Sequence, residues 1–167
     1  MTLAPPLRKL LLLLHIVTAV GWPGAVAAFL VLAGSGLNST NPQIVRSAYL
    51  TMPPITWYVI VPLAFASLLT GLLLSLTTKW GLFRYYWILA KFLINTLSLF
   101  LLLLHTRVIS AVATAAEKNN LSVADLHGER VQLVVISIAA LLALMAATIL
   151  SVYKPQGRVP TGLKTYD

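Results

Sequence analysis

Cysteine is absent from this 167-residue sequence. Its absence excludes disulfide bonds, thiolate metal sites, iron–sulfur clusters and covalent attachment of c-type haem. Acidic residues are also scarce, with four Asp plus Glu against twelve Lys plus Arg. None of the four acids lies inside a long apolar stretch. Intramembrane carboxylate relays and paired-carboxylate catalysis therefore have no candidate residues.

Apolar residues dominate what the sequence does contain. Hydrophobic residues make up 59% of the chain, and its mean hydropathy is +0.88, well above the range of soluble domains. The net charge of +8 lies mostly in short segments between and beyond the apolar stretches, which suits anionic lipid headgroups. No basic stripe carries interleaved aromatic residues, so we expect no nucleic-acid partner.

Four apolar stretches, residues 10–33, 55–78, 85–113 and 131–153, are each long enough to cross a bilayer. The first follows two cations, as a signal peptide would, but its length of about 24 residues predicts a membrane helix. Pro53-Pro54 predicts the start of the second span. We therefore expect an all-α integral membrane protein, with residues 1–167 forming a single transmembrane domain, a four-helix bundle.

The distribution of cations predicts the orientation. With both termini in the cytoplasm, seven cations would lie inside and four outside. The inner set is Arg8, Lys9, Lys79, Arg84, Lys154, Arg158 and Lys164, and the outer set is Arg46, Arg107, Lys118 and Arg130. The positive-inside bias therefore favours N-in and C-in.

The third span carries a polar stripe. Lys91, Asn95, Ser98, Leu102 and His105 follow one another at spacings of 4, 3, 4 and 3, which places them on one helix face. Polar side chains on such a face also bond neighbouring helices, and Lys91 has the alternative of snorkelling to the interface. Both interpretations stay open.

His15 and Lys91 are predicted at a similar depth, because each follows the cytoplasmic start of its span by a few residues. One inner site could therefore hold both. His105 lies near the outer end with Arg107, His127 and Arg130. A separation of about 15 to 20 Å in depth prevents His15 and His105 from sharing one iron.

A buried imidazole is a common axial ligand for haem iron, and cations near the interface suit haem propionates. The predicted cofactor-binding residues are His15, Lys91, His105, His127, Arg107 and Arg130, and the predicted metal ligands are His15 and His105. The alternatives are a hydrogen-bonding histidine at 15 or 105 and a solvated one at 127. Ser67, Gly71 and Ser75 form a small-residue run that predicts close helix packing.

The first span contains Leu14-His15-Ile16-Val17-Thr18-Ala19-Val20-Gly21-Trp22-Pro23-Gly24, and the third contains Trp87, Lys91 and His105. This pattern resembles small four-helix proteins of the bacterial inner membrane that include the copper-resistance protein CopD and HemJ-type protoporphyrinogen oxidases. The resemblance covers two of the four spans. It implies a multi-pass plasma-membrane protein, often a homo-oligomer, with His15 as a haem b ligand and Lys91 as a nearby cation.

The sequence thus leads to a haem-b-binding integral membrane protein, a redox or electron-transfer component. One alternative is a cofactor-free assembly or interaction subunit that packs against a membrane-protein partner. Another is a copper-associated membrane protein, although the absence of cysteine and the presence of three methionines leave few soft ligands. Whether the chain is an enzyme stays open; the resemblance implies a HemJ-like oxidoreductase.

Overall fold

The computed structural model describes residues 4–77, 85–118 and 126–153. Its elements are α1 (Pro5–Asn38), α2 (Pro42–Ile55), the π-helical turn η1 (Thr56–Ile60), α3 (Val61–Thr77), α4 (Tyr86–Glu117) and α5 (His127–Tyr153). Because α2, η1 and α3 follow one another without a break, the described chain has four helices long and apolar enough to cross a membrane. The predicted all-helical fold with four spans is confirmed.

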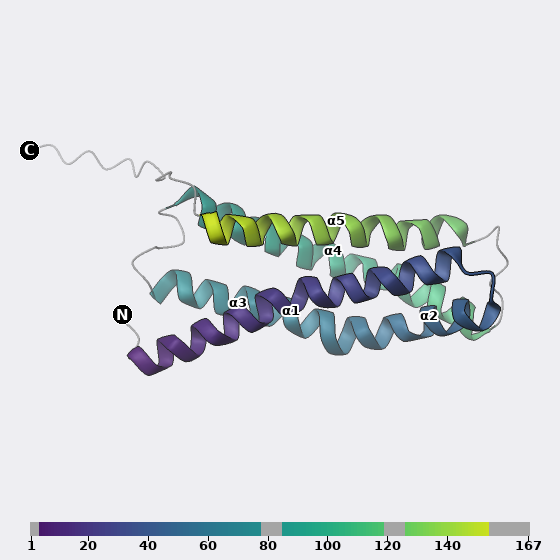
Figure 1. Ribbon diagram of the computed structural model, residues 1–167, viewed down its shortest axis with the longest axis horizontal. Coiled ribbons are helices and arrows are strands. Elements are labelled where there is room, and N and C mark those ends of the chain that lie inside the picture. The colour runs from purple at the N-terminus through teal and green to yellow at the C-terminus, as the bar shows by residue number, and fades with distance from the viewer. Residues whose placement is uncertain (1–3, 78–84, 119–125, 154–167) are drawn as a thin grey trace, which may run out of the picture.

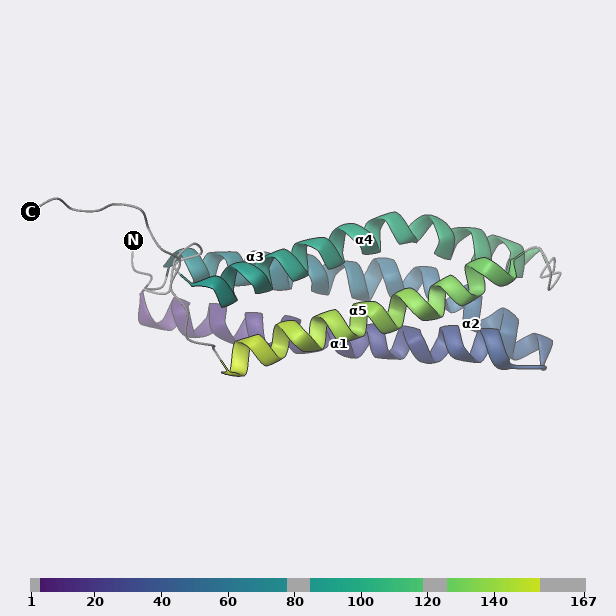
Figure 2. The same cartoon turned by 90° about the horizontal axis from the view of Figure 1, so that it is seen from above.

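The four spans alternate in direction and form an elongated bundle (Figures 1 and 2). α1 packs against α2, α3 and α5, and α4 packs against the same three helices. α1 and α4 are therefore diagonal in the bundle. We call the end where α1 and α4 begin the proximal end, and the end where they finish the distal end.

Large apolar side chains face outward on all four spans. Val20, Val31, Leu69, Leu93 and Leu142 are each more than half exposed. Such a surface is costly in water and favourable in hydrocarbon. Together with the length of the helices, it marks a multi-pass membrane protein.

The second span begins earlier than the sequence predicts. The Asn41 side chain accepts a hydrogen bond from the Gln43 backbone N–H at 2.9 Å, and Pro42 occupies the first turn, a common helix start. Pro53 and Pro54 lie inside α2, so the prediction that they begin the span is wrong. Since each lacks an N–H donor, the helix passes directly afterwards through the wider turn of η1.

Two arginines bond neighbouring helices at the distal end. Arg130, near the start of α5, donates to the Gly36 carbonyl at 2.6 Å and to the Tyr49 hydroxyl at 2.8 Å. Arg46 of α2 donates to the Ala116 carbonyl at 3.2 Å. Gly36 and Ala116 belong to the last turns of α1 and α4, whose free carbonyls form the negative ends of the helix dipoles. Both cations therefore cap the helices beside them.

Candidate functional site

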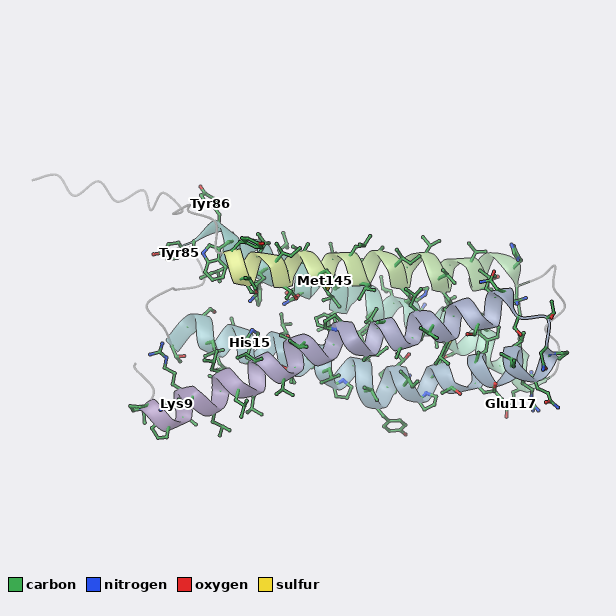
Figure 3. All side chains as sticks on the ribbon, viewed as in Figure 1. Lys9, His15, Tyr85, Tyr86, Glu117 and Met145 are labelled. Atoms are coloured by element: carbon green, nitrogen blue, oxygen red, sulfur yellow. The ribbon has the colours of Figure 1, made fainter. Side chains whose placement is uncertain are left out.

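A pocket of about 240 Å³ lies towards the proximal end, between α1, α3 and α4. We call it the proximal pocket. Its polar wall residues are Arg8, His15, Ser67, Ser75, Lys91 and Asn95, and leucines and aromatic residues form much of the remainder. Figure 3 shows His15 where α1 passes α3. Positive charge and apolar surface thus meet in one small pocket.

A hydrogen bond to α3 orients His15. Its Nδ1 lies 3.0 Å from Thr70 Oγ1, and that hydroxyl donates to the Ala66 carbonyl at 2.6 Å. Because the hydroxyl proton is directed to the carbonyl, Nδ1–H is the donor to Thr70, and Nε2 keeps its lone pair. His15, which lines the proximal pocket, thereby keeps one ring nitrogen able to accept a hydrogen bond or to ligate a metal.

The small residues of α3 make room for this imidazole. A Cβ atom on Gly71 would lie 3.0 Å from His15 Cε1, closer than ordinary van der Waals contact. Ser67 and Ser75, one turn to either side of Gly71, also line the pocket. The small-residue run therefore shapes the proximal pocket as well as permitting close helix packing.

Lys91 reaches across the bundle. Its Nζ donates to Ser151 Oγ of α5 at 2.7 Å, while that hydroxyl donates to the Ala147 carbonyl at 2.9 Å. Ser151 lies two residues before the end of α5, so the bond joins Lys91 to a neighbouring helix and is also compatible with a lysine that extends towards the proximal interface. No carboxylate is among the described residues that line the pocket.

A larger cavity, of about 660 Å³, lies between α1, η1, α4 and α5. We call it the central cavity. Its wall is mainly apolar and includes Val26, Phe29 and Ile109, with Gln132 among the few polar residues. His105 also lines it.

His105 is 7% exposed, and its Nε2 is buried without a hydrogen-bond partner among the residues that the structure describes. A buried polar atom left unpaired costs about 1 to 3 kcal/mol. An unpaired buried atom of this kind needs an explanation, and the residue that carries it lines the central cavity.

The polar stripe of α4 divides between the two spaces. Lys91 and Asn95 line the proximal pocket, whereas Ser98, Leu102 and His105 line the central cavity. One face of α4 therefore lines both the proximal pocket and the central cavity. The residues contributed by the other helices decide the chemistry of each space.

The predicted candidates near the distal end do not gather around His105. Arg107 and His127 are exposed, and Arg130 is buried in its bonds to α1 and Tyr49. None of these three lines the central cavity or the proximal pocket. Within residues 4–77, 85–118 and 126–153, no group of three or more His, Asp or Glu side chains could hold a metal ion.

Sequence reasoning named Arg8 among the cations near His15 but missed Thr70 and Gly71 as parts of this site. The small-residue run predicted only close helix packing for Gly71, and Thr70 does not stand out from other small polar residues of an apolar helix. Only the register between α1 and α3 singles them out.

No protein-family model matches this chain, and no curated protein or solved structure matches it either.

Proposed function

We propose that this chain is an integral membrane protein that binds haem b in the central cavity, with His105 as an axial ligand, and that it acts as a redox or electron-transfer component. The observation that carries the proposal is the buried Nε2 of His105, which lacks a partner among the described residues and belongs to a residue lining an apolar cavity. Imidazole nitrogen is a usual ligand of haem iron.

The volume of the cavity supports this choice over the proximal pocket. At about 660 Å³, the central cavity falls within the roughly 300 to 1,000 Å³ typical of cofactor and ligand pockets. The proximal pocket, at about 240 Å³, falls below that range. The resemblance implies His15 as the ligand, but the dimensions of the two spaces favour His105.

The residues around the cavity fit the needs of a porphyrin. Val26, Phe29 and Ile109 would pack on the macrocycle and exclude water, as apolar walls of bundle cofactor sites do. Gln132 of the wall would donate to a propionate. Bound haem would supply one-electron chemistry between ferric and ferrous iron.

We place the protein in a bacterial plasma membrane with both termini in the cytoplasm. The excess of cations in the segments on that side supports this orientation. The resemblance to the CopD and HemJ group supports the bacterial membrane. A reporter fused after Asp167 should be active only in the cytoplasm, and a reporter active outside it would reverse the orientation.

Visible absorption spectra test the cofactor. Protein expressed with ample haem and purified in detergent should show a Soret band that sharpens on reduction with dithionite. His105→Ala should lose that band, whereas His15→Ala, the matched histidine control, should keep it. A colourless wild-type protein would contradict haem binding and favour the cofactor-free assembly subunit. Stoichiometric copper without a Soret band would favour the copper-associated alternative.

A further inference from the structure

We propose that the proximal pocket binds the phosphate group of an anionic ligand. This site is separate from the central cavity and does not depend on the presence of haem. A phosphate diester in a lipid headgroup and inorganic phosphate share the chemistry that the pocket would recognise.

Uncompensated positive charge is the first observation. Arg8 and Lys91 both line the pocket, and no carboxylate does so among the described residues. The structure describes two acidic residues, Glu117 and Glu129, and both lie at the distal end. An anion from outside the chain would therefore supply the missing negative charge, which the half-buried Lys91 favours more strongly than the exposed Arg8.

The available hydrogen-bond donors are the second observation. The Lys91 ammonium has three N–H donors, and one of them bonds Ser151 Oγ. The Arg8 guanidinium carries five donors in a planar arrangement that matches phosphate oxygens. The two side chains come from diagonal helices, so their convergence on one pocket arises from the fold.

Depth and apolar surface favour a lipid as the source. Arg8 and Lys91 lie about 5 and 8 Å along the axis from the starts of α1 and α4, a depth suited to a headgroup. Leu12, Leu72 and Phe92 line the same pocket and would contact an acyl chain. Basic pockets between membrane helices on the cytoplasmic side are a known type of anionic-lipid site.

His15 adds a preference within the phosphate class. Because Nδ1–H is directed to Thr70, the free lone pair on Nε2 would accept a hydrogen bond from a ligand hydroxyl. A phosphoglycerol headgroup offers both the phosphate and the hydroxyl, as does hydrogen phosphate. Phosphatidylglycerol is therefore the lipid probe to use.

Native mass spectrometry of the delipidated full-length protein tests the site with phosphatidylglycerol against phosphatidylcholine. The wild type should bind phosphatidylglycerol preferentially. Lys91→Met and Arg8→Gln should each weaken this binding about tenfold or more, the loss of one charge-assisted hydrogen bond. Lys91→Arg should retain most of it. Lys9→Gln is the matched control, because Lys9 is exposed beside Arg8 and does not line the pocket.

Equal losses in Arg8→Gln and Lys9→Gln would overturn the proposal, since they would indicate surface charge alone. Wild-type affinity in Lys91→Met would overturn it as well. If Lys91→Met fails to fold, the comparison of Arg8→Gln with Lys9→Gln decides. The melting temperature is also measured in inorganic phosphate and in chloride at equal ionic strength. Stabilisation by phosphate would indicate that the pocket takes its phosphate group from a soluble ligand and not from a lipid. An unchanged visible spectrum in these variants separates this test from that of haem binding.

Discussion

The two ends of the bundle use positive charge in opposite ways. At the distal end, Arg130 and Arg46 donate to backbone carbonyls in the last turns of α1 and α4. At the proximal end, Arg8 and Lys91 line a pocket that has no carboxylate among its described residues. A chain rich in cations and poor in acids can therefore satisfy some cations with helix ends and leave others for a ligand.

The difference follows from the partners that each end offers. Gly36 brings the backbone of α1 close to Tyr49, so that Arg130 bonds a carbonyl and a hydroxyl at once. Lys91 meets one hydroxyl, that of Ser151. Distal substitutions should therefore affect stability most, and proximal ones should affect binding most.

The largest loss of stability should come from Arg130→Met. The substitution leaves the Gly36 carbonyl and the Tyr49 hydroxyl without their donor in a buried setting, at a cost of about 3 kcal/mol. Unfolding by sodium dodecyl sulfate in mixed micelles measures it. Arg107→Met, at an exposed position on α4, should leave stability unchanged. Equal stability of the two variants would mean that Arg130 does not hold the distal end together.

An intermediate loss should come from Gly36→Ala. The added Cβ would lie 2.6 Å from Tyr49 Cζ, and overpacking of this kind costs about 1 to 3 kcal/mol. Gly34→Ala is the control on the same helix, because nothing lies within 4 Å of its Cβ position. The melting temperature in detergent should fall for Gly36→Ala alone. A fall in both variants would point to a general need for glycine in this part of α1.

The smallest effect should come from Thr70→Val on the proximal side. It removes the acceptor of the His15 Nδ1–H bond, worth about 1 kcal/mol. Nitrogen-15 NMR of the imidazole should show that the His15 tautomers become mixed. Thr77→Val is the control, since Thr77 bonds the Leu73 carbonyl of its own helix. Unchanged His15 signals in Thr70→Val would show that another group fixes the ring.

The periodicity of the sequence predicted which segments are helices better than it predicted which residues contact one another between helices. The four spans and the polar face of α4 follow from hydropathy and from spacings of three and four residues. Pro53-Pro54 misled the prediction because a proline pair usually marks a helix start, whereas here η1 follows and the helix continues. The grouping of His105 with Arg130 also rested on depth alone, and depth does not tell which helices are neighbours.

Pairings between helices need the register of the bundle. Arg130 and Gly36, which share a hydrogen bond, are 94 positions apart in the sequence, and His15 and Thr70 are 55 positions apart. Nothing in the sequence around Gly36 or Thr70 marks either residue as the partner of a side chain on another helix. That Nε2 of His105 lacks a partner among the described residues likewise follows only from the packing of α1, α4 and α5 around the central cavity.

Imidazole rescue tests the central claim, that His105 holds haem in the central cavity, most directly. His105→Gly should purify without a Soret band, and added imidazole should restore the band by taking the place of the missing side chain beside the cavity. His15→Gly should keep the band without imidazole. A band that survives in His105→Gly, or one that is lost in His15→Gly and returns there with imidazole, would contradict the account.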